Sequence, residues 1–156
     1  MITLLETVLE RSDGSYISPQ DLQMLDQSIA SWQKRRESYN LVQTQESEIV
    51  DKVLKKIQKG TPLFSQPLPE DVVLKCHRDI SLVLRYCATA MLLQDEELLK
   101  DRLLYWMQNI MRALRHQKIN DRVYQVLQQV VQEQLPPENA NLMLPYLKIT
   151  HEWLSQ

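Results

Sequence analysis

Glycine is nearly absent from this chain of 156 residues, in which only Gly14 and Gly60 occur. Tight hairpin turns favour glycine because it adopts positive φ angles at little cost, so a sheet with many hairpins is not expected. No segment shows the strict alternation of apolar and polar residues that is typical of a strand. Apolar residues recur instead at intervals of three and four, which predicts an all-α fold.

The sequence also lacks an excess of charge of one sign, since its formal net charge is −2 and its basic residues are scattered. Such a chain has no overall field to attract nucleic acid or anionic lipid, and pairs such as Arg35-Arg36 are interpreted as solvated helix faces. The longest apolar run, Tyr86 to Leu93, is too short to span a bilayer, and the amino terminus has no basic segment of the signal-peptide type. We expect a cytoplasmic protein that binds no nucleic acid and does not insert into a membrane.

Only two cysteines are present, Cys76 and Cys87, and they lie eleven residues apart in a segment with helical spacing. At a rise of about 1.5 Å per residue, one helix would hold them about 16 Å apart. A disulfide needs Cα atoms within about 7 Å of each other. Both cysteines are therefore predicted to be free thiols.

The common catalytic signatures are missing as well: there is no glycine-rich phosphate loop, no nucleophile elbow and no pair of histidines at metal-ligand spacing. His77, His116 and His151 are isolated from one another, and each is interpreted first as a surface or hydrogen-bonded side chain. We expect neither a metal site nor an enzyme. The length is typical of one domain, which is predicted to comprise residues 1–156.

The amino-terminal 30 residues carry the signals of a helical hairpin. A first helix is predicted near residue 2 and ends at the turn Asp13-Gly14. A second helix is predicted to begin at Ser18, whose hydroxyl can accept a hydrogen bond from the first turn, and Pro19 suits the first helical position. That second helix either continues to Gly60 or is divided by a joint near Thr44.

The proline-rich stretch from Thr61 to Pro69 is predicted to be a loop. The strongest helical periodicity in the chain begins near Pro69 and runs for about six turns. Three further helices are predicted, the last of them interrupted or started at Pro145; their apolar positions span Leu98 to Leu114, Val123 to Val131 and Leu142 to Leu154.

The central helix contains a segment in which a thiol, a carboxylate and three basic side chains are adjacent, Lys75-Cys76-His77-Arg78-Asp79. A spacing of three places the Cys76 thiol and the Asp79 carboxylate on adjacent turns, within reach of one ligand. The three neighbouring cationic side chains are expected to lower the pKa of the thiol. Two plainer interpretations stay open: Cys76 is a buried, inert cysteine of the apolar stripe, and Asp79 pairs with Lys75.

Residues 75–80, followed by Leu84-Arg85, resemble the K-C-x-R-D-I…L-R segment of phycobiliprotein subunits. Residues 17–23 and residues 99–110, with Asp101, are similar to two further segments of that family. The resemblance implies an all-α, globin-like (phycocyanin-like) helical domain with an amino-terminal helical hairpin over residues 1–30 that is used for docking.

The resemblance also implies a site for a bilin, a linear tetrapyrrole. Cys76 matches the thiol that forms a thioether to the bilin. Asp79 matches the carboxylate that binds the N–H groups of the two inner pyrrole rings, and Arg78 matches a cation that pairs with a propionate. Each role suits the chemistry of its side chain, and binding is expected to be covalent or non-covalent.

Several positions depart from the family pattern. Leu82 and Val83 stand where aromatic residues are usual, Tyr105 and Trp106 replace small residues, and residues 94–96 lack the usual glycine. These differences indicate a divergent member, resembling the globins associated with bilin biosynthesis or turnover. A haem globin would need a histidine opposite the central helix; His116 is the candidate, but no distal partner accompanies it.

The resemblance implies docking of the hairpin against a second subunit, in a homodimer or heterodimer. The apolar edge of the first helix would otherwise face water; the alternative is that this helix folds back on its own core. We expect a bilin-binding protein in bilin handling, bilin biosynthesis or light harvesting, associated with phycobilisomes on the thylakoid surface. The alternative is a chromophore-free protein that binds phycobilisome components or bilin-processing enzymes.

Overall fold

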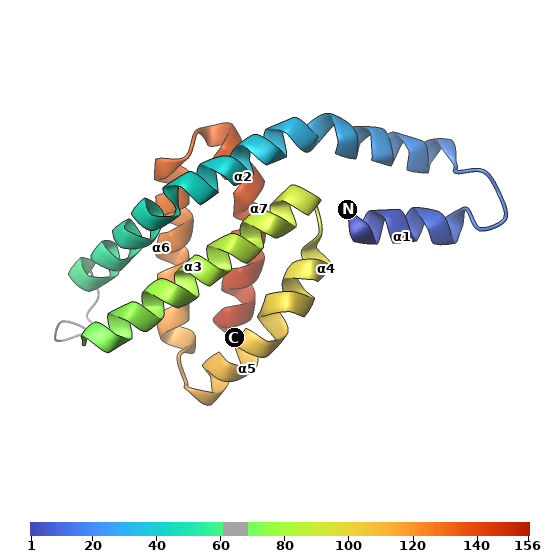
Figure 1. Cartoon of the computed structure of the whole chain (residues 1–156). Coiled ribbons are helices and arrows are strands. Elements are labelled where there is room, and N and C mark those ends of the chain that lie inside the picture. Colours follow the sequence, from blue (N-terminus) through green and yellow to red (C-terminus); the bar gives the residue numbers. More distant parts are fainter. Residues whose placement is uncertain (61–68) are drawn as a thin grey trace.

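A computed structural model describes residues 1–60 and 69–156, and every regular element in these two ranges is helical. The predicted loop over residues 61–69 lies, apart from Pro69, outside the described residues. Figure 1 shows the elements in order, and their bounds are α1 (Ile2–Arg11), α2 (Pro19–Gly60), α3 (Glu70–Leu93), α4 (Glu96–Leu99), the π-helical turn η1 (Lys100–Leu104), α5 (Tyr105–Ala113), α6 (Gln117–Gln134) and α7 (Pro137–Leu154).

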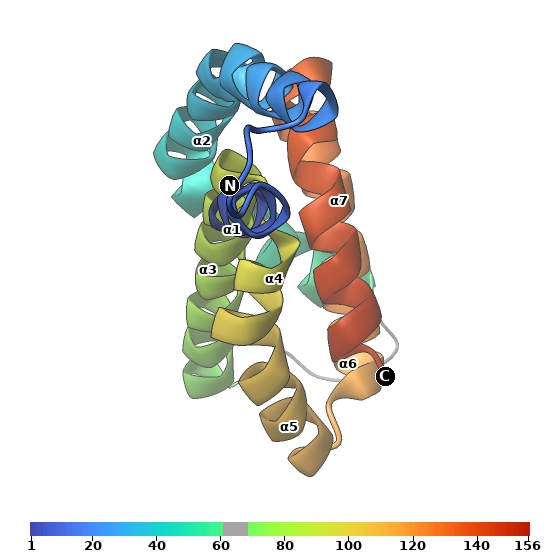
Figure 2. The same cartoon turned by 90° about the vertical axis from the view of Figure 1, so that its right-hand side faces the viewer.

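One apolar core joins the second half of α2 to α3, η1, α6 and α7. Figure 2 shows α3 and α7 on opposite sides of the molecule, with α4 and α5 between them. The core side chains are predominantly aliphatic and include Ile49, Val53, Leu84, Leu103, Leu127, Val130, Met143 and Leu147. The predicted all-α fold is confirmed over the described residues.

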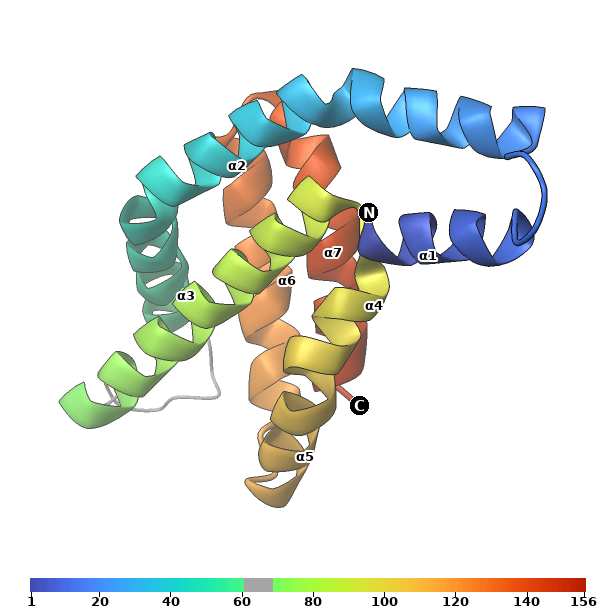
Figure 3. The ribbon, with the colours of Figure 1, turned by 45° about the vertical axis from the view of Figure 1, so that its right-hand side comes forward.

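Helix α2 is one continuous element of 42 residues. Of the two predicted alternatives, the single helix that continues to Gly60 is confirmed, and a joint near Thr44 is not observed. The Thr44 hydroxyl bonds to the carbonyl of Asn40 at 2.8 Å, within the helix. At the start of α2, the Ser18 hydroxyl accepts a hydrogen bond from the backbone amide of Asp21 at 3.1 Å, as predicted. Figure 3 shows that α2 bends and that its first half, with α1 below it, extends away from the other helices.

Arg35 joins α2 to the end of α3, and its interpretation as a solvated residue is wrong, because its exposed fraction is 1%. Its guanidinium donates to the carbonyls of Leu92 and Ser28 and to the Ser31 hydroxyl. Leu92 lies in the last turn of α3, where carbonyls lack partners within the helix. Burial lowers the pKa of Arg35, and these hydrogen bonds offset the cost of burying the charge.

Helix α1 is attached to the other helices through Asp95. The Thr3 hydroxyl donates to the Asp95 carboxylate at 2.9 Å, and the Thr3 amide donates at 3.2 Å. The same carboxylate caps α4 by accepting from the backbone amide of Leu98. Within α1 itself only Val8 is buried, so the apolar edge of this helix is largely exposed.

The stretch from α4 to α5 is not the regular helix that the spacing predicted. The five-residue turn η1 interrupts the α-helical hydrogen-bonding pattern, and an insertion of this kind rotates the following helix about its axis. Leu104 and Met111 are consequently buried, whereas Ile110 and Leu114, two positions of the apolar spacing that predicted this helix, are exposed.

The carboxyl-terminal helix begins earlier than the sequence indicated. Helix α7 starts at Pro137, and Pro145 lies within it, so the predicted start or interruption at Pro145 is wrong. Pro137 occupies the first turn, where its missing N–H costs nothing. Asn139, in the same turn, donates to the Ser38 hydroxyl at 2.8 Å and thereby fixes α7 to α2.

Candidate functional site

Helix α3 and the run from α4 to α5 form the two arms of a V that meet at the carboxyl end of α3 (Figure 1). Gln94 makes this corner possible by adopting a left-handed conformation, with φ of 51°, and Asp95 then caps α4. A pocket of about 440 Å³ lies between the arms, and we term it the outer pocket; its lining includes Val72, Arg78, Leu82, Trp106, Ile110 and Leu114.

A second pocket, of about 190 Å³, lies between α3 and α6, and we term it the inner pocket. It is lined by Ile80, Ile119, Asn120, Val123 and Tyr124 together with five residues that also line the outer pocket: Val72, Cys76, Asp79, Met111 and His116. The shared wall makes the two pockets neighbouring chambers of one site. Cavities for small ligands commonly measure about 300–1,000 Å³, and the two chambers together reach this range.

The three residues that the sequence singled out all lie on the wall of the outer pocket. Cys76 and Asp79 line both chambers, while Arg78 lines only the outer one. Cys76 and Cys87 are both free thiols, as predicted. The structure therefore brings a thiol, a carboxylate and a guanidinium to one cavity with a mainly apolar lining.

The Cys76 thiol is not activated by its cationic neighbours, so the predicted lowering of its pKa is wrong. Burial, and then the negative charge of Asp79, raise the pKa of the half-buried Cys76 thiol. Lys75 lies instead 3.6 Å from the Asp71 carboxylate. Arg78 directs its guanidinium to Asp79. The thiol form therefore predominates at neutral pH.

Arg78 and Asp79 form an ion pair of modest strength. The Nε and Nη2 atoms of Arg78 each lie 3.3 Å from one Asp79 oxygen, and the Arg78 side chain is largely exposed. The alternative pairing of Asp79 with Lys75 is not observed. Exposed pairs of this kind contribute about 0–1 kcal/mol, so a ligand with its own donors and acceptors can replace this one.

The three histidines differ in their surroundings. His151 is held between Gln128 and Asp121, at 3.0 and 2.7 Å, and His77 lies 3.9 Å from Asp51. His116, the haem candidate, lies just before α6 and lines both chambers. Over residues 1–60 and 69–156, no group of three potential metal ligands occurs.

Two aromatic residues of the site were not recognised from the sequence as ligand contacts. Trp106 was noted only as a departure from the family pattern, yet it lines the outer pocket and is partly exposed there. Trp106, Ile110 and Leu114 recur every four residues and could have indicated this second apolar face. Tyr124 carries no such signal, because its role depends on how α6 packs against α3.

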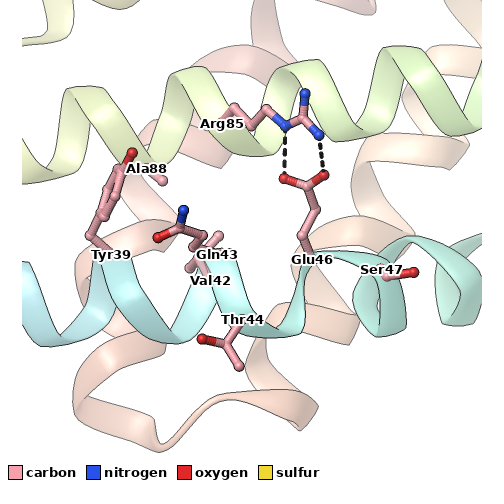
Figure 4. Close-up of a pocket in the computed structure, with 8 residues that line it drawn as sticks. All are labelled: Tyr39, Val42, Gln43, Thr44, Glu46, Ser47, Arg85 and Ala88. Atoms are coloured by element: carbon pink, nitrogen blue, oxygen red, sulfur yellow. Dashed lines mark hydrogen bonds and ion pairs between the residues drawn. The ribbon is translucent and has the colours of Figure 1, made fainter.

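A further pocket, of about 460 Å³, lies between α2 and α3 and is more polar (Figure 4). Arg85 and Glu46 occupy its rim and form a two-point ion pair, with distances of 2.9 and 2.7 Å. The pair raises the pKa of Arg85. Neither cysteine lines this pocket, so it lacks the groups that distinguish the α3–α5–α6 site.

The fold is the all-α, globin-like arrangement preceded by an amino-terminal helical extension, as predicted. The chain belongs to the phycobilisome protein family, whose sequence model matches residues 10–154. It is similar to the C-phycocyanin beta chain of Aglaothamnion neglectum, with 28% identity over 120 residues, which are 73% of this chain and 70% of that protein. The predicted family membership is thereby confirmed.

No helix in the described parts of the chain is both long enough and apolar enough to cross a membrane. The longest, α2, has a negative mean hydropathy.

Proposed function

We propose that this protein binds a linear tetrapyrrole in the outer and inner pockets and acts in bilin handling. The observation that carries the proposal is the convergence of Cys76, Arg78 and Asp79 on one largely apolar cavity, in a member of the phycobilisome protein family. A bilin is a flat, mainly apolar molecule with central N–H groups and two carboxylates. The site offers a partner for each of these features.

Asp79 is the proposed partner of the inner pyrrole N–H groups, because a carboxylate accepts several converging hydrogen bonds. Arg78 and Lys75, at the outer pocket, are the proposed partners of the propionates. Trp106 provides an aromatic surface on which a pyrrole ring can stack. These contacts require Arg78 to exchange Asp79 for a propionate.

Non-covalent capture is proposed to precede any attachment, since the raised pKa of Cys76 keeps the thiolate a minor species near neutral pH. Attachment would be an addition: the S–H bond of Cys76 and the π bond of an unsaturated substituent of the bilin break, a C–S bond forms, and the thiol proton passes to the ligand. No oxidant or reductant is consumed. We therefore propose bilin carriage without turnover and expect slow attachment in the isolated protein.

The test is reconstitution with phycocyanobilin followed by denaturation, comparing the wild type with Cys76→Ala and with Cys87→Ala as the matched control. We expect pigment to stay attached to the wild type and to Cys87→Ala, and to be released from Cys76→Ala. Release from all three would exclude the thioether and leave non-covalent carriage. Absence of any red-shifted absorption before denaturation would reject the bilin function.

An exposed apolar surface supports a second function, docking. We propose that α1 and the first half of α2 bind a second subunit, either a copy of this chain or another phycobilisome protein. Several large apolar side chains are exposed there, namely Ile2, Leu5, Leu9, Leu22, Met24 and Ile29. An apolar surface of this kind is typical of an interface, and a chromophore-free interaction protein would use the same surface.

Leu9 and Leu74 form a matched pair for testing this surface, with exposed fractions of 67% and 65% on α1 and α3. We expect Leu9→Glu to shift the protein, or its complex with phycobilisome subunits, toward the monomer in sedimentation velocity, and Leu74→Glu to leave the assembly unchanged. A wild-type protein that is monomeric alone and in such mixtures would refute the docking proposal.

A further inference from the structure

Tyr124 is a buried tyrosine whose hydroxyl has no hydrogen-bond partner among the residues that the structure describes. It lies on α6, its exposed fraction is 2%, and it lines the inner pocket. No hydrogen bond joins its hydroxyl to any of residues 1–60 or 69–156. Among the described residues, the fully buried polar side-chain atoms without a partner are Gln45 Oε1 and Ser81 Oγ, and the Tyr124 hydroxyl is not one of them. The hydroxyl is therefore open to water or to a ligand, and the cavity that Tyr124 lines is the inner pocket.

The Tyr124 hydroxyl is suited to donate a hydrogen bond. Burial, together with the negative charge of Asp79, raises its pKa, so the phenol keeps its proton at every physiological pH. Asn120, its polar neighbour in the inner pocket, already donates to the carbonyl of Leu154 at 3.0 Å. Tyr124 is thus a hydrogen-bond donor on the wall of the inner pocket.

The charges around the two chambers indicate what kind of acceptor fits. Lys75 and Arg78 line the outer pocket and are absent from the residues that line the inner one. Asp79, by contrast, faces both chambers. A carboxylate placed in the inner pocket would face Asp79, and the cation that pairs with Asp79, Arg78, lies on the outer side. Of the described residues that line the inner pocket, His116 is the one whose side chain could carry a positive charge there. A neutral carbonyl meets no repulsion from Asp79.

We propose that Tyr124 determines specificity by donating a hydrogen bond to a neutral carbonyl of the ligand, the terminal lactam of a linear tetrapyrrole, which enters the inner pocket. This inference rests on the proposed bilin function and adds an orientation to it. The lactam end points toward α6, and the propionates stay in the outer pocket beside Lys75 and Arg78.

The experiment is an equilibrium titration of the full chain with biliverdin and with biliverdin dimethyl ester, followed by visible absorption. Tyr124→Phe removes only the hydroxyl, and Tyr86→Phe, on α3 and outside both chambers, is the matched control. We expect Tyr124→Phe to bind both pigments about three- to tenfold more weakly than the wild type, the usual effect of one neutral hydrogen bond. Tyr86→Phe should bind like the wild type.

The dimethyl ester separates the two acceptors of the pigment, because esterification neutralises the propionates and leaves the lactams intact. Equal affinity of Tyr124→Phe and the wild type for biliverdin would overturn the inference while leaving the bilin function in place. A loss seen with biliverdin but not with the ester would overturn it too, since the propionate would be the acceptor. Failure of the wild type to bind either pigment would instead reject the bilin function.

Thermal unfolding of the ligand-free proteins distinguishes a ligand contact from a structural role. The hydroxyl of Tyr124 makes no bond within the described chain, so the melting temperature of Tyr124→Phe should equal or exceed that of the wild type. A clear fall in melting temperature would show that the hydroxyl supports the fold and would overturn the inference.

Discussion

Cys76 and Cys87 carry the same thiol in two environments on one helix. Cys87 is fully buried, its Sγ lies 3.4 Å from the Thr150 hydroxyl, and burial raises its pKa to about 12. Cys76 lines the pockets and is only half-buried, and its pKa is raised as well. The two thiols therefore differ mainly in their exposure to solvent.

This contrast predicts that only Cys76 reacts with a disulfide reagent such as DTNB in the native protein. Because its pKa is raised, the reactive thiolate is scarce at pH 7, and the rate should still be increasing as the pH passes the ordinary thiol value. Cys76→Ser should abolish the native reaction, and denaturation should release Cys87. A rate that is already maximal at pH 7 would contradict the raised pKa.

Asp95 joins three elements at the corner between α3 and α4, and its charge makes this junction sensitive to pH. Burial alone would raise the pKa of Asp95, but hydrogen bonds from the amides of Thr3 and Leu98 and from the Thr3 hydroxyl hold it below its ordinary value. A carboxylate with a lowered pKa stabilises the fold above its unfolded-state pKa. That contribution is lost as the pH falls through the native value.

We expect Asp95→Ala to lower the free energy of unfolding by about 1–2 kcal/mol at pH 7, the usual effect of losing a cap. Urea denaturation measures this loss, and it should shrink on acidification below the ordinary aspartate pKa. Glu96→Ala, one residue further on and exposed, should change stability by less than about 0.5 kcal/mol. Equal effects of the two substitutions would refute the role of Asp95.

Site residues could be predicted where the geometry of a single helix determines their relative positions. The spacing of Cys76 and Asp79 placed both on one pocket wall, because α3 is regular there. The pKa of Cys76 could not be predicted, since it depends on Lys75 pairing with Asp71 and on burial by other helices. Tyr124 was missed for the same reason, as its surroundings come from α3 and α6 together.

At the scale of elements, Arg35 and Arg36 show how little a sequence pattern says about burial within a long helix. The two residues are adjacent and have the same charge, yet Arg35 is buried and Arg36 is exposed. Neither the period of α2 nor its composition separates them. The difference arises because the last turn of α3, with the Leu92 carbonyl, ends beside Arg35.

Substitution of Arg35 and of Arg36 tests the contact between Arg35 and the Leu92 carbonyl directly. We predict that Arg35→Met lowers the free energy of unfolding by about 2–3 kcal/mol, since charged hydrogen bonds to Leu92 and Ser28 are lost. Arg36→Met, on the exposed side of α2, should stay within about 0.5 kcal/mol of the wild type. Urea unfolding curves decide the question, and similar midpoints for the two variants would contradict the proposed anchor.

The run from α4 to α5 shows where periodicity fails. The apolar positions at intervals of three and four predicted one regular helix that includes Ile110 and Leu114, but η1 interrupts it, and both residues line the outer pocket. The residues of η1 carry no sequence signal that predicts a π-helical turn. Trp106 lies on the pocket wall for the same reason, which makes the interruption of the helix part of the site.

At the scale of the whole molecule, helix content and order could be predicted from apolar spacing, from Pro19 near the start of α2 and from Gly14 in a turn, but the start of α7 at Pro137 was not predicted. The two-chamber cavity could not be predicted, because it arises from the angle between α3 and the α4–α5 run and from the packing of α6 against α3. The binding of a bilin in these two chambers is therefore tested directly.

That test is the location of the bilin, measured by titrating phycocyanobilin into three proteins and following the red-shifted absorption. Val72 lines both chambers, so the larger side chain of Val72→Trp reduces the space in them. Thr44→Trp introduces the same side chain at the pocket between α2 and α3. We predict that Val72→Trp binds about tenfold more weakly or worse, while Thr44→Trp binds like the wild type. Undiminished binding by Val72→Trp, or no absorption change with the wild type, would contradict the account.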